Sequence, residues 1–309
     1  MNNMNDNNSI AILLSTYNGE KFLNQQLQSL ANQRAKNFTV FVRDDMSSDN
    51  TIKILQKWKS KIKINILPSD KNLGPAKSFM VLANKCGNYK YYAFCDQDDV
   101  WDEDKLEVAV EKLKDIDEPC LYFCNSRTID SNGNVIHDDQ IIQRNFISIE
   151  SEIVCGFCPG CAMVFNDALM NLIRNQHYDH IVMHDMVFIM NAFVFGKVIY
   201  DSSSHFSRRM HSENVVGREG KNLFGRFKQT YRRWFNNNSI TMDVFVSEFL
   251  TNIKNSTFST KIDVNNLYTV ANYRRSMKNK AKIIRNHRFD SYNKRARLSF
   301  NIRTILNLL

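Results

Sequence analysis

Hydrophobic and polar positions follow two patterns that alternate over residues 10–125. Short runs of consecutive apolar residues are typical of buried strands, whereas apolar residues three and four apart, such as Leu23, Leu27 and Leu30, are typical of a helix with one buried face. The runs predict strands at 10–15, 38–43, 62–67, 91–95 and 120–124. The periodic segments predict helices at 20–33, from about 49, at 75–86 and at 102–116. Because strands alternate with helices, we expect an α/β fold in which a mostly parallel, Rossmann-like sheet is flanked by helices.

Polar clusters follow three of the predicted strands. Residues 15–20 read STYNGE, residues 43–49 read RDDMSSD, and residues 96–99 read DQDD. A solvated turn would explain one such cluster but not three, and ligands of these sheets bind beyond the carboxyl ends of the strands, so we expect the clusters to meet in one crevice. Two carboxylates two residues apart, Asp96 and Asp98, suit Mg²⁺ or Mn²⁺ together with substrate phosphates. The pattern therefore points to a nucleotide-linked substrate whose diphosphate the metal neutralises.

The longest apolar stretch, residues 181–200, is interrupted by polar side chains: His184, Asp185, Asn191 and Lys197. A membrane-spanning helix needs about 20 predominantly apolar residues, and a charged residue at its centre costs about 2.5–3.5 kcal/mol. We therefore predict a buried helix followed by a strand.

Composition indicates one large domain with an appendage, since 43% of the 309 residues are hydrophobic and only 10 are Gly and 4 Pro. The opening MNNMNDNN lacks the apolar core of a secretory signal, so we expect a cytoplasmic protein. Seven scattered cysteines suit reduced thiols better than a disulfide framework. Cys155, Cys158 and Cys161 have the spacing of zinc ligands, but no fourth ligand lies at a customary distance, so we interpret them as core or loop thiols.

Charge is unevenly distributed along the chain. From residue 205 onward there are 21 Lys and Arg against 6 Asp and Glu, a surplus of 15, which leaves residues 1–204 at −6 within the total of +9. The negative net charge of residues 1–204 indicates a cation site. The positive net charge of the C-terminal tail, from residue 205 onward, indicates an anionic partner. Basic residues of the tail are interleaved with apolar ones, as in an interfacial amphipathic helix. These apolar residues include Tyr231, Trp234, Phe235, Phe289, Phe300 and Leu309.

Two interpretations of the tail, residues 218–309, remain open. An anionic membrane surface accepts both charged and apolar side chains, whereas nucleic acid offers mainly charge and is the weaker interpretation. The alternative is a set of helices that pack on the preceding domain or on a second subunit, with the arginines in solvent. Both interpretations predict a mainly helical tail.

Four segments resemble a known family. LLSTYNGEKFLNQQLQSLANQ, VRDDMSSDNT, NLGPAKSF and FCDQDDVWDEDKL occur in the order, and at roughly the intervals, of family 2 glycosyltransferases with the GT-A fold. The last segment is most similar to that of bacterial members that build surface polysaccharides, often described as rhamnosyl- or galactosyltransferases. The resemblance covers about residues 9–217, so we assign residues 1–217 to a GT-A catalytic domain. It implies inverting transfer of a sugar from a UDP- or dTDP-linked donor to a saccharide acceptor, which we expect to be lipid-linked.

The resemblance also implies a donor site. Ser15, Tyr17 and Asp45 match positions that bind the base and ribose, and Arg209 matches an arginine that can bind the diphosphate through two hydrogen bonds. The implied donor-binding residues are Ser15, Tyr17, Asn18, Asp44, Asp45, Lys77, Asp96 and Arg209. The alternatives are packing for Tyr17, helix capping for the two strand-end aspartates, and solvated surface charge for the basic residues.

A metal site and a general base follow from the same resemblance. Asp98 matches the metal ligand, Asp96 is its partner, and His211 matches a histidine that can bind the metal or a phosphate oxygen. The cofactor is then Mn²⁺ or Mg²⁺. Asp185 matches the carboxylate that accepts the proton of the acceptor hydroxyl. Relatives commonly have tryptophan after this aspartate, and Met186 here indicates a different acceptor pocket.

The acceptor side is implied by the segment GFCPGCAMVFN and by residues that adjoin the acidic motifs. Gly156 and Gly160 would allow the backbone to approach a sugar closely, and Trp101 and His184 complete this side. The alternative for Asp185 is a buried helical carboxylate that pairs with His184 or caps the helix.

Two other functions remain open from the sequence. A metal-dependent nucleotidyltransferase would use the same acidic crevice for phosphoryl transfer and release pyrophosphate. A non-enzymatic membrane- or nucleic-acid-binding protein would depend on the basic tail alone. For the glycosyltransferase we expect a peripheral location at the inner face of the cytoplasmic membrane.

Overall fold

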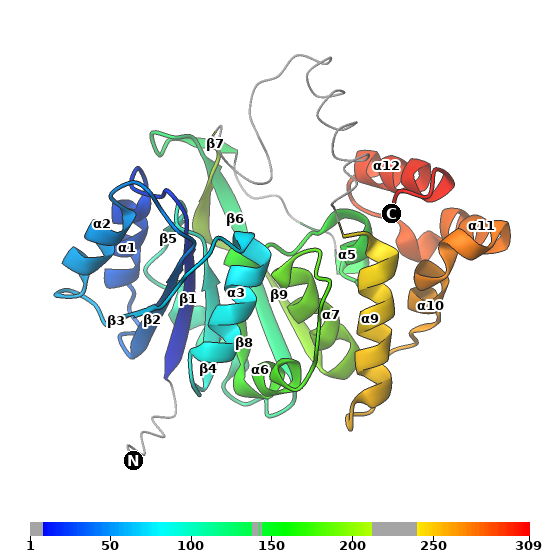
Figure 1. Cartoon of the computed structure of the whole chain (residues 1–309), viewed down its shortest axis with the longest axis horizontal. Helices are drawn as coiled ribbons and strands as arrows, with labels where there is room; N and C mark the ends of the chain where they lie inside the picture. The colour runs from blue at the N-terminus through cyan, green and yellow to red at the C-terminus, as the bar shows by residue number, and fades with distance from the viewer. Residues whose placement is uncertain (1–8, 138–141, 143, 212–239) are drawn as a thin grey trace.

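The structure is a computed structural model that describes residues 9–137, 142, 144–211 and 240–309. Its described strands form one nine-stranded sheet in the order β3-β2-β1-β4-β8-β6-β9-β5, with β7 paired to β6 (Figure 1). The strands are β1 (Ile10–Thr16), β2 (Phe38–Asp44), β3 (Ile64–Leu67), β4 (Tyr91–Cys95), β5 (Val100–Trp101), β6 (Cys120–Ile129), β7 (Val135–His137), β8 (Met163–Asn166) and β9 (Lys197–Arg209).

The first four strands of the chain form the parallel part of the sheet. β1 pairs with β2 and with β4, β2 pairs with β3, and all three ladders are parallel. β8 then runs antiparallel to both β4 and β6, while β6 and β9 are again parallel. β5 pairs antiparallel with β9 at the end of the sheet, and β7 pairs antiparallel with β6. The predicted α/β class is confirmed, and the sheet is parallel where the regular alternation of strands and helices predicted it.

Helices flank the sheet. The α-helices before the tail are α1 (Leu23–Ala31), α2 (Thr51–Trp58), α3 (Gly74–Lys85), α4 (Lys105–Leu113), α5 (Ile149–Cys155), α6 (Asp167–Arg174) and α7 (His184–Phe195). In Figure 1, α1 and α2 lie on one side of β1, and α3 lies on the other, where it packs on β1 and β2. All seven residues of β2 are buried between these layers, which explains why the consecutive residues Val40, Phe41 and Val42 are apolar on both faces of the strand.

The apolar stretch 181–200 forms a buried helix and then a strand, as predicted. Ten of the twelve residues of α7 are buried, and β9 begins two residues after the helix ends. None of the described helices combines the length and the apolar character needed to cross a bilayer.

The tail is helical over its described part, residues 240–309, as predicted. It contains α9 (Met242–Asn255), α10 (Asn265–Ala271), α11 (Met277–Arg285) and α12 (Lys294–Ile305), with short 3₁₀ turns η3 (Tyr273–Arg275) and η4 (His287–Phe289). The boundary between residues 217 and 218, and the apolar residues Tyr231, Trp234 and Phe235, lie outside the described residues.

These tail helices pack on the preceding domain and on one another. The backbone N–H of Lys261 donates to the carbonyl of Val194 in α7 over 2.7 Å, and Glu248 of α9 accepts from the N–H of His180 over 2.9 Å. Phe245 and Phe249 of α9 are fully buried, and burial of such a side chain is worth about 1.5–3 kcal/mol. The interpretation of the tail as packed helices is therefore correct for the described part.

The apolar side chains predicted to meet a membrane have another environment. Phe289, Phe300 and Leu309 are at most 3% exposed, and the rings of Phe289 and Phe300 stack with their centroids 5.8 Å apart. The prediction that these three contact lipid is wrong, because they form the core of the tail itself. Helical spacing shows that residues share a face but not what covers that face.

Candidate active site

A cavity of about 930 Å³ lies at the carboxyl ends of β1 and β4 and extends to α5 and α7. It brings together most of the residues predicted from the motifs. The predicted residues that line it are Ser15, Tyr17, Asn18, Asp45, Asp96, Asp98, Gly156, Gly160, His184, Asp185 and His211. The predicted residues outside its lining are Asp44, Lys77, Trp101 and Arg209. The expectation that the strand ends converge on one crevice is confirmed.

The two aspartates at the end of β2 differ in their surroundings. Asp44 accepts hydrogen bonds from the Thr16 hydroxyl and the Ser47 N–H, each over 2.8 Å, and so holds the two strand-end loops together. Asp45 faces the cavity and accepts from the N–H groups of Leu73 and Gly74, each over 2.7 Å. Burial opposes its charged form, but these N–H groups and the buried Arg43 guanidinium hold the pKa of Asp45 below its usual value. Asp45 is therefore an anion at neutral pH.

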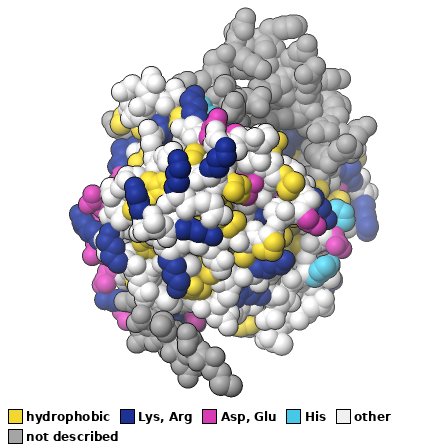
Figure 2. Space-filling view, turned by 60° about the vertical axis from the view of Figure 1, so that its left-hand side comes forward, with side chains coloured by type: hydrophobic (Ala, Val, Ile, Leu, Met, Phe, Trp, Pro, Cys, Tyr) yellow, Lys and Arg dark blue, Asp and Glu magenta, His cyan; other side chains and the backbone are white. Residues whose placement is uncertain are grey.

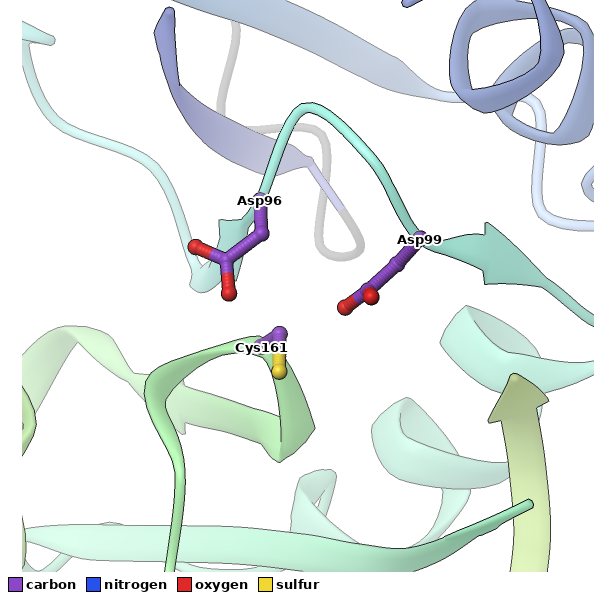
Figure 3. A group of neighbouring side chains, drawn as sticks. All are labelled: Asp96, Asp99 and Cys161. Carbon is purple, nitrogen blue, oxygen red and sulfur yellow. The ribbon is translucent and has the colours of Figure 1, made fainter. Parts of the chain in front are cut away.

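The turn between β4 and β5 carries the acidic cluster. The carboxylates of Asp96 and Asp99 lie on two sides of this turn and face the thiol of Cys161, which lies in η2 (Gly160–Ala162) (Figure 3). One ligand atom from each of the three lies within 4.8 Å of the others. Burial, reinforced by the charge of Asp98, raises the pKa of Asp96 to about 6 and that of Asp99 to about 8.

These carboxyl groups fit a divalent cation. One oxygen of Asp99, Oδ2, is buried and has no hydrogen-bond partner among the residues that the structure describes, and the other accepts from the N–H of Arg209 over 3.1 Å. A cation beside Asp96 and Asp99 would favour their ionised forms, because its positive charge offsets the cost of burying these carboxylates and their repulsion by Asp98. Asp98 lies next to His211 instead, with its Oδ2 2.7 Å from Nε2 of the ring.

The predicted metal ligands therefore fall into two neighbouring sets. Asp96 belongs to the group with Asp99 and Cys161, and Asp98 and His211 form a pair. Asp99 is part of the acidic motif but was not predicted as a metal ligand, because the motif does not show that its carboxylate is buried beside Asp96. Of the three cysteines with zinc-like spacing only Cys161 belongs to this group, so their thiols do not converge on one ion.

Asp185 enters the cavity from the first turn of α7. Its Oδ2 accepts from the Gly160 N–H over 3.2 Å, and its Oδ1 accepts from the Met186 N–H over 2.8 Å. Burial raises the pKa of Asp185 to about 6, although these N–H groups partly offset the rise. At neutral pH the group is an anion with a basicity suited to accepting a proton.

His184 does not pair with Asp185. Its ring stacks on Phe79 with centroids 4.0 Å apart, and neither ring nitrogen has a hydrogen-bond partner within the described part of the chain. Burial lowers the pKa of His184 to about 3, so the ring is neutral. A Cβ at Gly160 would lie only 2.5 Å from Nε2 of this ring, so the glycine allows the loop to pass the histidine. Gly156, with φ of 58°, ends α5 in the left-handed conformation.

Three predicted residues, besides Asp44, lie outside the lining of the cavity. Arg209 is 1% exposed, and its guanidinium donates to the carbonyls of Asp98 and Asp130 and to Gln25. Lys77 is exposed on α3 and lies outside the cavity lining. Trp101 is buried with the Lys105 ammonium 3.7 Å from its ring centroid, and it lines a second cavity instead.

Arg208, which the motif comparison passed over, lines the main cavity in place of Arg209. Successive residues of a strand point to opposite faces, so only one of these two arginines can face the cavity. The alternation of side chains along a strand is therefore the feature of the sequence that could have identified Arg208. Glu152 and Tyr292 also line the cavity and were missed, because the packing that brings them there is long-range.

One face of the outer surface carries charged and hydrophobic side chains together. Figure 2 brings the left-hand side of Figure 1 forward, and Lys and Arg side chains are scattered across that face among hydrophobic ones. Six carboxyl groups line the interior cavity: Asp45, Asp96, Asp98, Asp99, Glu152 and Asp185.

The partly parallel sheet and the acidic cavity at its strand ends have the layout that the motif resemblance implies. Residues 11–173, more than half of the chain, match the sequence model of glycosyl transferase family 2. The chain belongs to that family, and the resemblance of its motifs is confirmed.

Curated relatives match over part of their length. The dTDP-rhamnosyl transferase RfbG of Shigella flexneri is 37% identical over 124 residues, which are 38% of this chain and 40% of RfbG. The chondroitin synthase of Escherichia coli is 30% identical over 213 residues, which are 67% of this chain and 29% of the synthase. The chain thus aligns with less than half of the length of either relative.

Solved structures show the same fold. Staphylococcus aureus TarS, residues 1–349 in complex with UDP-GlcNAc, matches with a TM-score of 0.58 at 17% identity, over 96% of this chain and 81% of that chain. The mannosyltransferase PcManGT of Pyrobaculum calidifontis, in complex with GDP-Man and Mn²⁺, matches with a TM-score of 0.54 at 14% identity, over 96% and 74%. At these identities the likeness concerns the fold, which is the expected GT-A fold.

Proposed function

We propose that the protein is an inverting glycosyltransferase that moves a sugar from a UDP- or dTDP-linked donor to a saccharide acceptor. The observation that carries the proposal is the Asp185 carboxylate, which faces the same cavity as the acidic strand ends. Membership in the family and the donors named for RfbG and TarS support it. The name of the chondroitin synthase supports a role in polysaccharide synthesis, and we propose that the product here is a surface polysaccharide.

The cavity residues divide into donor and acceptor functions. Ser15, Tyr17, Asn18 and Asp45 hold the nucleoside at the ends of β1 and β2. The residues that would hold the cation, Mn²⁺ or Mg²⁺, are Asp96, Asp98 and Asp99 of the acidic turn together with His211 after β9. When bound, it supplies positive charge that stabilises the diphosphate leaving group. Arg208 takes the role first assigned to Arg209, because its side chain lines the cavity.

Asp185 acts on the acceptor. As the acceptor oxygen attacks the anomeric carbon, its proton passes to the Asp185 carboxylate, and the bond from that carbon to the diphosphate oxygen breaks. The attack comes from the face opposite the leaving group, so the configuration at the anomeric carbon is inverted. The products are the glycoside and a nucleoside diphosphate.

Release of nucleoside diphosphate tests this function against its rivals. The protein with Mn²⁺ and a panel of UDP- and dTDP-sugars is expected to release UDP or dTDP slowly without acceptor and faster with one. Release of pyrophosphate would instead identify a nucleotidyltransferase. If neither product forms and no nucleotide binds, the glycosyltransferase proposal is wrong and a non-enzymatic role of the tail is favoured.

We also propose that α12 contacts an anionic membrane surface, where a lipid-linked acceptor would lie. Leu298 and Ile305 are 61% and 57% exposed, and their separation of two helical turns puts them on one side of α12. Leu306 is 51% exposed, and Lys294 and Arg295 are exposed at the start of the helix. Apolar and basic side chains on one surface suit the interface of an anionic bilayer.

The double substitution Leu298→Glu and Ile305→Glu tests this contact. It is expected to lower cosedimentation with phosphatidylglycerol vesicles at low salt by about tenfold or more, because two apolar contacts are lost and two like charges are added. Val244→Glu on α9, at a residue 40% exposed, is the matched control and is expected to bind normally. If the double variant binds vesicles as well as the unchanged protein does, α12 is not the membrane contact.

A further inference from the structure

The C-terminal region contributes a side chain to the wall of the active-site cavity. Tyr292, in the segment between η4 and α12, lines the cavity and is 36% exposed. The segment is held on both sides of this tyrosine. The Ser291 hydroxyl accepts from the Asn293 N–H over 3.1 Å, and the Asn293 side chain caps α12 by accepting from Arg295 and Ala296. The backbone at Tyr292 is therefore preorganised, which lowers the entropy lost when the ring contacts a ligand.

Helix α5 connects the tail to the cavity. It packs on α7 on one side and on η4 and α12 on the other, and it lies between them in Figure 1. Glu150 of this helix accepts from the Asn266 amide over 2.6 Å, and Arg288 lies 3.9 Å from the same carboxylate. Glu152, two residues later, lines the cavity. One turn of α5 thus fixes the tail with one carboxylate and presents a second to the cavity.

Glu152 and Asp185 bind the two ends of the loop formed by residues 157–160. Oε2 of Glu152 accepts from the N–H groups of Phe157 and Cys158 over 3.0 and 3.3 Å, and Asp185 accepts from Gly160. A buried carboxyl group that is hydrogen-bonded at only one oxygen has capacity left for a ligand. Oε1 of Glu152 makes no such bond within the described residues.

The protonation of Glu152 makes it a donor. Burial, with a further contribution from the Asp185 charge, raises the pKa of Glu152 to about 8, so the group carries a proton at neutral pH. Since Oε2 already accepts two hydrogen bonds, the proton belongs on Oε1. Tyr292 lines the same cavity as Glu152, and burial raises the pKa of its hydroxyl, with a further rise from neighbouring Cys155 and Glu152.

We propose that Glu152 and Tyr292 form the subsite for the acceptor sugar, with Tyr292 against the ring and both groups hydrogen-bonded to hydroxyls next to the one that Asp185 deprotonates. A sugar has an apolar ring face, which can pack on the Tyr292 ring, and hydroxyl groups, which can hydrogen-bond to both side chains. The inference rests on the proposed glycosyltransferase function. It makes the C-terminal region part of the active site.

Kinetics with simple acceptors test the subsite. The probes are p-nitrophenyl glycosides of glucose, galactose, N-acetylglucosamine and rhamnose, used with the donor that the protein hydrolyses. Tyr292→Ala is expected to raise the KM for the best glycoside by about tenfold or more, because the ring contact is lost. Tyr292→Phe is expected to raise it by a few-fold, because only one neutral hydrogen bond is lost. UDP affinity and donor hydrolysis without acceptor are expected to change by less than about twofold.

Two further variants separate binding from folding. Tyr268→Ala is the matched control, because Tyr268 is also 36% exposed in the tail but lies outside the cavity lining, and its KM is expected to be unchanged. Glu152→Ala is expected to raise KM and lower the melting temperature, whereas Glu152→Gln, which retains an acceptor for the loop and a donor for the sugar, is expected to restore both.

Each other outcome has a distinct meaning. If Tyr292→Ala leaves the KM for the glycoside unchanged, or weakens UDP binding as much as it raises KM, the subsite is wrong. The subsite is also wrong if the unchanged protein hydrolyses donor but neither uses nor binds any of the four glycosides. If it binds no nucleotide and hydrolyses no donor, the proposed function fails instead.

Discussion

Asp185→Asn is expected to lower the rate of glycosyl transfer by about a hundredfold or more while UDP binding persists. The substitution preserves the shape of the side chain but removes the group that accepts the proton of the acceptor hydroxyl. Transfer is measured as acceptor-dependent UDP release, and UDP affinity by calorimetry. Asp179→Asn, at a side chain that is 70% exposed, is the matched control and is expected to be fully active.

The pH profile provides a second check on this residue. A base must be ionised to accept a proton, so the rate of the unchanged protein is expected to rise as pH increases through about 6, the raised pKa of Asp185, and then level off. The residual rate of Asp185→Asn should lack this rise. An equal loss of UDP affinity and turnover would assign Asp185 to donor binding, and a lower melting temperature with little soluble protein would indicate a structural role.

Asp98→Asn is expected to abolish measurable transfer and to remove the effect of Mn²⁺ on nucleotide binding, with the fold intact. Asp98 is next to His211, and an amide in its place binds a divalent cation much more weakly than a carboxylate does. Calorimetric titration of UDP with and without Mn²⁺ measures this effect.

Asp115→Asn, at an exposed residue after α4, is the control for this change and is expected to retain the Mn²⁺ effect. The metal role is contradicted if a chelator leaves both UDP binding and turnover of the unchanged protein as they were. Retention of both by Asp98→Asn would instead assign the cation to Asp96 and Asp99 alone.

The sequence predicted those parts of the molecule in which a local pattern determines the structure. β2 and α7 are buried along nearly their whole length, so their apolar runs were direct evidence of strand and buried helix. Asp45, Asp98 and Asp185 follow strand ends or begin a helix within motifs, and the structure brings all three to one cavity.

The remaining parts depend on contacts between distant segments. The motif placed Arg209 at the donor, but carbonyls of the Asp98 and Asp130 backbone occupy its guanidinium, and its neighbour Arg208 faces the cavity. Phe300 lies in a helical pattern that suits a membrane or a protein core equally well, and only the packing of η4 against α12 decides between them. Tyr292 reaches the cavity because the tail folds back onto α5, which no local pattern records.

Helix α5 contacts both the C-terminal tail and the loop beside Asp185, and this has a consequence for how such enzymes diverge. Glu150 holds the tail and Glu152 holds the loop beside Asp185, so a single helical turn is constrained from both sides. A lineage that exchanged or shortened its C-terminal helices would alter the wall of its own catalytic cavity at the same time. Changes of acceptor are therefore expected to be inherited together with changes in residues 286–293, far along the chain from the motifs that define the family.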